Sequence, residues 1–157
     1  MNAPPSTTPT VRRARADDVP WLASFNVALA LETESKRLDV ERVERGVRAV
    51  ILDEHKGLYF VAELDGERVG QCMVNYEWSD WGDCWAWWIA SVYVRPDARR
   101  KGVLRALFSH VEGELRARGD VRELRLYVVE GNTPARSAYA SLSMRKTEYA
   151  IYERDVE

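Results

Sequence analysis

Residues 85–105 read WAWWIASVYVRPDARRKGVLR, and this stretch decides the fold. Its apolar first half, residues 85–94, predicts a buried central strand, which ends before Pro96 because proline has no N–H to donate to a sheet. A helix follows from Val103, since apolar side chains recur on one helical face at Leu104, Leu107, Phe108, Val111 and Leu115. A strand, a basic turn and a helix therefore follow one another directly.

The basic turn between strand and helix is suited to bind an anion. The first N–H groups of a helix have no partner within the helix, and the helix dipole adds positive charge there. Gly102 lets the backbone approach a phosphate closely. Four cations lie in the same segment: Arg99, Arg100, Lys101 and Arg105. Cations are unfavourable at a helix N-terminus without an anion, which favours phosphate binding over a solvated basic turn.

The predicted central strand changes its apolar alternation partway along. Alternate residues of a strand face the same side of the sheet. The apolar residues that alternate up to Ile89 face one side, and those that alternate from Val92 face the other. A β-bulge, one extra residue near Ala90 and Ser91, accounts for this change. An unbroken apolar run accounts for it equally well, so both interpretations stand.

Working outward, apolar periodicity and turn residues predict the remaining elements. Asp39 caps one of the helices, and Asp65 with Gly66 forms the turn of a hairpin. The other strands are expected at about residues 11–15, 58–64, 68–78, 124–128 and 144–153, and the other helices at about residues 17–34, 39–53 and 134–142. The order β-α-α-β-β-β-α-β-α-β defines a mixed α/β sheet.

The composition is that of a globular protein. With 157 residues, 46% hydrophobic and 31% charged, we expect a single domain over residues 11–157 and a disordered tail over residues 1–10. A formal charge of −2 argues against nucleic acid as a partner. We expect no membrane span or signal peptide and a cytoplasmic location. Cys72 and Cys84 are too few for a disulfide framework or a zinc cluster, and we expect no metal.

Two motifs resemble those of the GNAT superfamily of acyl-CoA-dependent N-acyltransferases. Arg99-x-x-Gly102 fits the first part of the signature Q/R-x-x-G-x-G/A, while Leu104 departs from its last, small position. Residues 132–139 resemble the N-x-x-A-x-x-x-Y motif, although Ser-Met stands at residues 143–144 where Gly-Phe is usual. The resemblance covers about residues 11–153. It implies a mostly antiparallel central sheet with helices on both faces.

The resemblance also implies roles for individual residues. Backbone groups of Val92, Tyr93 and Val94 would bind the pantetheine arm and the thioester carbonyl of acetyl-CoA. The turn and the first helical residues would wrap the pyrophosphate: Arg99, Arg100, Lys101, Gly102, Val103, Leu104 and Arg105. Asn132 would bind CoA through its side-chain amide. Tyr139 would protonate the departing thiolate; the apolar helix face on which it lies also permits an ordinary core role.

Transfer to an amine requires a group that accepts a proton, directly or through water. The tryptophan-rich strand has no carboxylate, so the candidates flank it. Glu77 is our first choice, because the end of its strand should lie beside the mouth of the central strand. The other candidates are Asp80, Asp83, Glu32 and Glu34. Each of them is also typical of a solvated surface, and His55 and His110 are expected to be unrelated to catalysis.

Five of the six tryptophans fall within residues 78–88. Trp87 and Trp88 are adjacent and so face opposite sides of a strand, which places part of the cluster in the core. The remainder suits either an acceptor site for a cationic amine or a partner-binding surface.

The sequence favours an N-acetyltransferase in which an amine attacks acetyl-CoA directly. A non-catalytic acyl-CoA-binding or sensor domain of the same fold is the alternative, and an aromatic protein-interaction module is a third. A small amine, an amino acid, a peptide N-terminus and a lysine side chain all remain open as acceptors. Residues 144–157 provide only one strand after the last helix, so we expect an exposed sheet edge that a homodimer would cover.

Overall fold

The computed structural model describes residues 8–156, and the chain divides into two compact units at Tyr127 and Val128. The strands of the first unit are β1 (Thr10–Arg13), β2 (Leu58–Leu64), β3 (Glu67–Ser79), β4 (Cys84–Val94) and β5 (Val121–Leu126). Its helices are α1 (Val19–Glu34), α2 (Val40–Leu52) and α3 (Val103–Arg118), and the second unit contains α4 (Thr133–Ser141). Short 3-10 turns at Ala16–Asp18, Glu54–Lys56 and Pro96–Ala98 join some of these elements.

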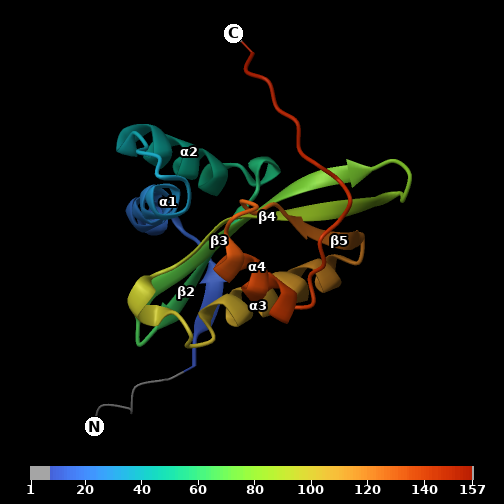
Figure 1. Ribbon diagram of the computed structural model, residues 1–157. Helices are drawn as coiled ribbons and strands as arrows, with labels where there is room; N and C mark the ends of the chain where they lie inside the picture. Colours follow the sequence, from blue (N-terminus) through green and yellow to red (C-terminus); the bar gives the residue numbers. More distant parts are fainter. Residues whose placement is uncertain (1–7, 157) are drawn as a thin grey trace. The chain divides into compact units, whose positions relative to one another are not determined.

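Within the described residues, five strands form one sheet in the order β1-β2-β3-β4-β5 (Figure 1). Neighbours are antiparallel from β1 to β4, and β5 runs parallel to β4. The β2–β3 hairpin closes on Asp65 and Gly66, both at positive φ, as a two-residue turn between twisted strands requires. The predicted mixed, mostly antiparallel sheet is confirmed.

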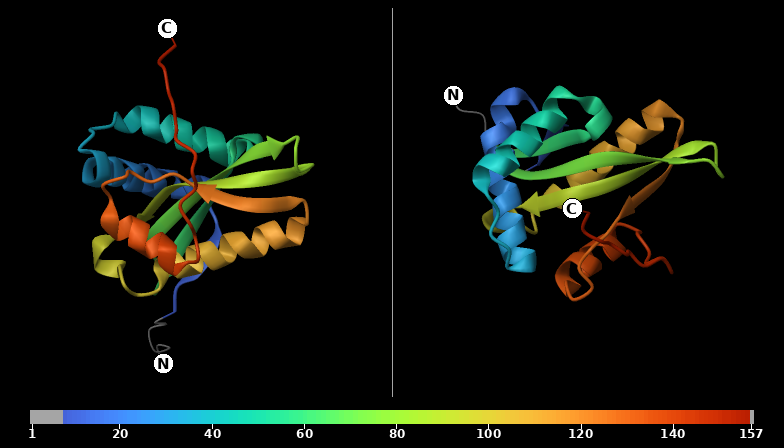
Figure 2. Two further views of the ribbon diagram at one scale, coloured as in Figure 1. Left: turned by 45° about the vertical axis from the view of Figure 1, so that its right-hand side comes forward. Right: turned by 90° about the horizontal axis from the view of Figure 1, so that it is seen from above.

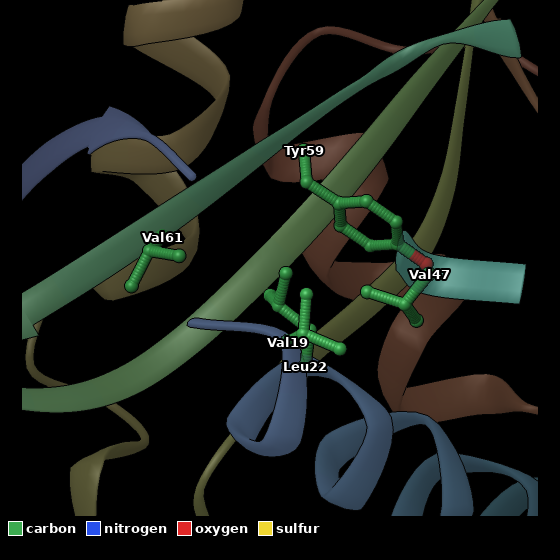
Figure 3. Close-up of a cluster of buried hydrophobic side chains, with 5 residues drawn as sticks. All are labelled: Val19, Leu22, Val47, Tyr59 and Val61. Atoms are coloured by element: carbon green, nitrogen blue, oxygen red, sulfur yellow. The ribbon is translucent and has the colours of Figure 1, made fainter. Parts of the chain in front are cut away.

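Helices cover both faces of this sheet, with α1 and α2 on one face and α3 on the other (Figure 2). Residues of β2 alternate between the two layers. Tyr59 and Val61 pack with α1 and α2 in a buried cluster that includes Val19, Leu22 and Val47 (Figure 3). Phe60 faces the opposite way, and its ring lies 5.1 Å from the ring of His110 on α3. His110 is therefore a packing residue of α3.

Helix α2 shows how local sequence sets an element's bounds. The Asp39 carboxylate accepts a hydrogen bond from the Arg42 N–H at 3.1 Å, which satisfies one of the unpaired donors of the first turn. Val43, Val47, Val50 and Ile51 then face the cluster shown in Figure 3. The predicted cap is present, and the predicted apolar face lies against the core except at Val40, which is 51% exposed.

Two predicted strands differ from the structure. The expected strand at residues 124–128 is β5, Val121–Leu126, because Val121 is buried and pairs with Trp85. The expected strand at residues 144–153 is wrong: this segment joins no sheet within residues 8–156. Its apolar alternation fits a strand, but a strand also needs a partner for its backbone groups, and Tyr152 is 94% exposed.

At the N-terminal end, β1 begins at Thr10, inside the expected tail, and residues 1–7 of that tail lie outside the described residues. No helix of the described part of the chain is long and apolar enough to span a bilayer. Over the same residues, no three His, Cys, Asp or Glu side chains gather as a group able to hold a metal ion.

A buried carboxylate anchors the start of α1. Asp18 is 0% exposed, and it accepts hydrogen bonds from Arg12 at 2.7 and 3.0 Å, from Arg68 at 2.6 Å and from the Arg15 N–H at 2.7 Å. Burial disfavours the charged form, but these donors outweigh it and hold the pKa of Asp18 well below its usual range. One side chain thus joins α1 to β1 and to the start of β3.

Replacing this carboxylate tests its contribution to stability. We expect Asp18→Asn to lower the free energy of unfolding at pH 7 by about 2–4 kcal/mol, because it leaves two arginines without their shared anion. Since the folded pKa is depressed, the Asp18 contribution is present above pH about 4 and is lost as the pH falls further. The difference between the two proteins in urea denaturation should therefore shrink below pH 4.

Asp17→Asn is the matched control. Asp17 lies 3.5 Å from the same Arg68, but its side chain is mostly exposed, so its replacement should change stability by less than about 0.5 kcal/mol. Equal losses in the two variants would contradict the anchoring role of Asp18.

Candidate functional site

The C-terminal half of β4 extends beyond the end of β5. The parallel ladder between these strands ends at the pair Ile89 and Leu126, whereas β4 continues to Val94. Within residues 8–127, β5 therefore has no pair with the last five residues of β4, residues 90–94. This side of β4 offers backbone groups of the kind that an extended amide-containing ligand can pair with.

The same part of β4 contains a β-bulge. Gln71 pairs with Tyr93, but Met73 pairs with Ala90, so two residues of β4 lie opposite one residue of β3. Ser91, within the bulge, has a φ of 50°, a left-handed conformation that side chains other than glycine rarely adopt. Of the two interpretations of the apolar alternation, the one with a bulge is confirmed.

Helix α3 begins close to this segment of β4. A Cβ on Gly70 of β3 would lie 2.9 Å from the Val103 Cγ1 and 3.1 Å from the Tyr93 carbonyl oxygen, so only glycine permits this approach. Gly102 caps the helix at a φ of 81°, and no atom lies within 4 Å of the place a Cβ would take. The first turn of α3 thus has open space beside its cap.

Three cations accompany this open helix N-terminus: Arg100, Lys101 and Arg105. All three are exposed, and none forms an ion pair with the chain over residues 8–156. Unpaired cations and unsatisfied N–H groups at one helix end are an electrostatic arrangement that favours a bound anion such as a phosphate. Leu104, at the departing signature position, is only partly buried and leaves the backbone donors in place.

Arg99, the first residue of the signature, is directed elsewhere. Its guanidinium binds Glu32 at the end of α1 at 2.7 Å, donates to the Val94 carbonyl oxygen at 2.9 Å and stands 5.8 Å from the Tyr93 ring centre. Arg99 therefore binds the last residue of β4 and links it to α1 through Glu32. A hydrogen bond from Arg99 lowers the pKa of Glu32, which makes this carboxylate a weaker proton acceptor.

Glu77, our first choice as general base, lies on the β3–β4 hairpin. Its carboxylate accepts a 2.6 Å hydrogen bond from the Trp88 indole and lies 3.5 Å from Arg125. Glu77 pairs with Ala86, and the four residues from there to Ala90 span about 13 Å of strand. A proton transfer from an acceptor at the bulge to Glu77 would therefore pass through water.

The other carboxylate candidates do not gather at one point. Asp80 and Asp83 are exposed at the tip of the β3–β4 hairpin, where Asp83 has a φ of 47°. Glu34 is exposed at the last position of α1. Of the candidates from the sequence, only Glu32 contacts a residue of the predicted cofactor segment.

The second unit contains the other predicted motif. Asn132 caps α4: its Oδ1 accepts a hydrogen bond from the Ala135 N–H at 3.2 Å. Pro134 lies in the first turn, as predicted, and Tyr139 is half-buried about two turns from the cap, in the same unit. The cap function of Asn132 explains its position at the start of α4.

The tryptophan cluster divides as adjacent strand positions require. Trp87 is buried, whereas Trp88 is half-buried beside Tyr127, with ring centres 6.2 Å apart. Trp78 stacks edge to face on Trp85, and Trp81 at the hairpin tip is 95% exposed. An exposed aromatic surface with acidic neighbours thus extends along the hairpin.

A buried polar network under the bulge was not anticipated from the sequence. It consists of Asn26 on α1, Tyr59 on β2, Gln71 on β3 and Ser91 on β4. The sequence contains one sign of this network: Gln71 is a polar residue on the same face of its strand as the apolar Val69 and Met73. The partners were not predictable, because they come from elements far apart in the chain.

The buried Cys72 is not a reactive thiol. Burial raises the pKa of its thiol to about 12, so the thiol stays protonated.

Comparison with known proteins defines the class to which this fold and site belong. The profile of the acetyltransferase (GNAT) family matches residues 25–144, so the chain belongs to that family. No curated protein matches the sequence. A solved structure of a possible acetyltransferase from Clostridium difficile 630 is 41% identical, with a TM-score of 0.87 over 95% of this chain and 98% of the other.

More distant solved structures share the fold. A predicted acetyltransferase with acetyl-CoA from Clostridium acetobutylicum is 13% identical, with a TM-score of 0.75 over 94% of this chain and 96% of the other. The aminoglycoside N-acetyltransferase AAC(6')-Iy in complex with CoA is 16% identical, with a TM-score of 0.77 over 99% and 98%. At these identities the likeness concerns the fold. The first of these structures holds acetyl-CoA and the second holds CoA.

A charge placed beside the α3 cap tests the anion site. Gly102→Glu should weaken acetyl-CoA binding about tenfold or more in calorimetry, because a carboxylate then faces the group that the helix N-terminus and cations attract. The open space at Gly102 means that the new side chain meets no atom of the chain at its Cβ.

Gly119→Glu is the matched control at the other end of the same helix. Gly119 has a φ of 76° and equally open surroundings, so the backbone strain and the added charge are alike. Affinity should stay within about twofold of wild type in this variant. Unchanged affinity in a folded Gly102→Glu protein would place the pyrophosphate elsewhere.

Proposed function

We propose that this protein moves the acetyl group of acetyl-CoA to a primary amine. One observation carries the proposal: a bulged strand segment without a β5 partner leads, within ten residues, to an open and cationic helix N-terminus. Acetyl-CoA has the matching chemistry in the matching order. Its thioester and pantetheine amides suit a strand edge, and its pyrophosphate suits a helix N-terminus with cations.

We assign each part of this ligand to residues of the chain. Val92, Tyr93 and Val94 would pair with the pantetheine amides and the thioester carbonyl. The first-turn N–H groups of α3, together with Arg100, Lys101 and Arg105, would hold the pyrophosphate. Acetyl-CoA supplies an activated carbonyl carbon, and the role of the chain is to hold and polarise it.

The proposed reaction is a direct displacement. The amine nitrogen forms a bond to the thioester carbon, the carbon–sulfur bond breaks, and an amide and CoA thiol result. One proton leaves the nitrogen and one joins the sulfur. We assign the first to Glu77 through water and the second to Tyr139, whose assignment rests on the family motif.

The acceptor is proposed to be a cationic amine. Trp78, Trp81 and Trp85 present aromatic faces along the β3–β4 hairpin, and Asp80 and Asp83 add negative charge at its tip. Such a surface attracts a protonated amine by cation–π and Coulomb interactions before it loses its proton. A homodimer stays a prediction beside this proposal.

Release of CoA thiol from acetyl-CoA, measured across an amine library, tests the proposed function. The library should contain simple amines, amino acids, peptides with a free N-terminus or lysine, and aminoglycosides, since one neighbour in fold acetylates the last class. We expect release above the amine-free rate for at least one class. Tight acetyl-CoA binding with no release for any amine would support the non-catalytic binding or sensor domain instead.

Removal of one hydroxyl tests the proton donor. Tyr139→Phe should lower turnover by about 10²-fold with little change in acetyl-CoA affinity, because the variant cannot deliver a proton to the thiolate. Tyr152→Phe, the same change at an exposed tyrosine of the same unit, should leave turnover unchanged. Equal turnover in the two variants would return Tyr139 to a packing role.

The base assignment is tested by the pH dependence of kcat/KM. Glu77→Gln should alter the acidic limb of the profile, since the variant has no carboxylate to deprotonate as the pH rises. Glu123→Gln on the neighbouring strand removes a carboxylate that also binds Arg125, and its profile should match wild type. Identical profiles for both variants would move the proton to another carboxylate or to bulk water.

A further inference from the structure

The buried polar network lies on the α1 side of the bulge and ends on the backbone of Ser91. The Asn26 Nδ2 donates to the Tyr59 hydroxyl at 3.0 Å, and the Gln71 Nε2 donates to the Asn26 Oδ1 at 2.7 Å. The same Gln71 Nε2 donates to the Ser91 carbonyl oxygen at 3.2 Å. Tyr59 also forms a hydrogen bond with the Ser91 side chain. Gln71 therefore connects the backbone of the bulge to α1, and Tyr59 connects its side chain.

Packing alone does not account for a glutamine at this position. Gln71 is 0% exposed, and among the described residues its Oε1 is buried with no hydrogen-bond partner. A buried acceptor without a donor costs stability, and packing between apolar neighbours does not by itself require an amide here. Val69 and Met73, two residues away on either side, are apolar. A functional constraint on the Gln71 amide is the better explanation.

The constraint follows from the geometry of the peptide group. In a trans peptide the carbonyl of one residue and the N–H of the next point in opposite directions. The hydrogen bond from Gln71 fixes the Ser91 carbonyl toward the network, so the Val92 N–H points away from Gln71. Over the described residues, the ladders of β3 and β5 include neither Ser91 nor Val92 as a pair.

The left-handed conformation of Ser91 needs this support. A serine at a φ of 50° is strained relative to an extended strand residue, and such strain persists only where surrounding contacts hold it. Gln71 supplies a contact to the carbonyl of that residue. Tyr59 holds the side chain of Ser91, but of the two only the Gln71 contact acts on its carbonyl. Without that contact, the peptide between Ser91 and Val92 loses the hydrogen bond that sets the direction of the Val92 N–H.

We propose that Gln71 is a positioning residue, which holds the Ser91–Val92 peptide so that the Val92 N–H donates to the thioester carbonyl of the bound acyl-CoA. This inference rests on the proposed function for the identity of the ligand. Gln71 itself does not touch the ligand. Its effect reaches the reacting carbonyl through one peptide group. The N–H of that peptide polarises the carbonyl and stabilises the negative charge that forms on its oxygen as the amine adds.

A pair of ligands that differ at the carbonyl tests this role without any need for turnover. Acetyl-CoA and S-ethyl-CoA are nearly the same size, but the thioether has no carbonyl to accept the Val92 N–H. By calorimetry, wild type should bind acetyl-CoA about three- to tenfold more tightly than S-ethyl-CoA, as expected for one hydrogen bond. In Gln71→Leu the ratio should fall to about one, with S-ethyl-CoA affinity retained.

Met73→Leu is the control, because Met73 lies on the same face of β3 and packs against the α1–α2 cluster outside the polar network. Its affinity ratio should equal that of wild type. Should Gln71→Leu fail to fold, Gln71→Met removes the same polar atoms with an unbranched side chain and is read by the same ratio.

The outcomes separate this inference from the proposed function. A wild-type ratio above one that persists in a folded Gln71 variant overturns the positioning role, as does a wild-type ratio of one. Failure of wild type to bind either ligand overturns the proposed function instead. A ratio that falls only in the Gln71 variants supports the positioning role, while transfer to an amine is decided by the release of CoA thiol.

Discussion

The rest of the site depends on the point where β4 stops pairing with β5. Up to Ile89 the two strands share a ladder, and their backbone groups satisfy one another. Beyond it, residues 90–94 of β4 have no β5 partner, and backbone groups on that side need other partners. A strand in this state costs stability unless a ligand pairs with it, and an acyl-CoA, with its amides and thioester in an extended chain, is the ligand that we propose.

Helix α1 is fixed to the sheet at three places, at its start, near its middle and near its end, and two of them lie beside the segment of β4 that has no β5 partner. At its start, Asp18 binds arginines of β1 and β3. Near its middle, Asn26 binds Gln71 below the bulge, and at its end Glu32 binds Arg99 after β4. These contacts are charged or polar and directional, so they fix the position of α1 more closely than apolar packing does. The position of α1 is consequently coupled to the bulge of β4.

Much of this arrangement was predictable from local sequence. Asp39 capped its helix, Asp65 and Gly66 closed their hairpin, and the segment around Gly102 formed the expected strand, turn and helix, because each of these features depends on neighbouring residues. The bulge was visible only as one of two interpretations. Family resemblance supplied the ligand, and the family match over residues 25–144 confirms that resemblance.

The remaining features depend on contacts between distant residues, which periodicity does not encode. Arg99 was expected to face a phosphate, yet Glu32, 67 residues away in the chain, binds it. Gln71 and Asn26 are 45 residues apart, and neither belongs to a motif. The apolar alternation of residues 144–153 predicted a strand, but a strand exists only where another strand accepts its hydrogen bonds.

Hydrogen–deuterium exchange of the full chain, with and without acetyl-CoA, tests most directly whether the segment of β4 without a β5 partner, residues 90–94, is the ligand site. If it is, acetyl-CoA will slow exchange at the amides of residues 92–94 and, in the same experiment, at those of residues 103–105 in the first turn of α3. Protection confined to other parts of the chain, with these two segments unchanged at saturating acetyl-CoA, would contradict the account.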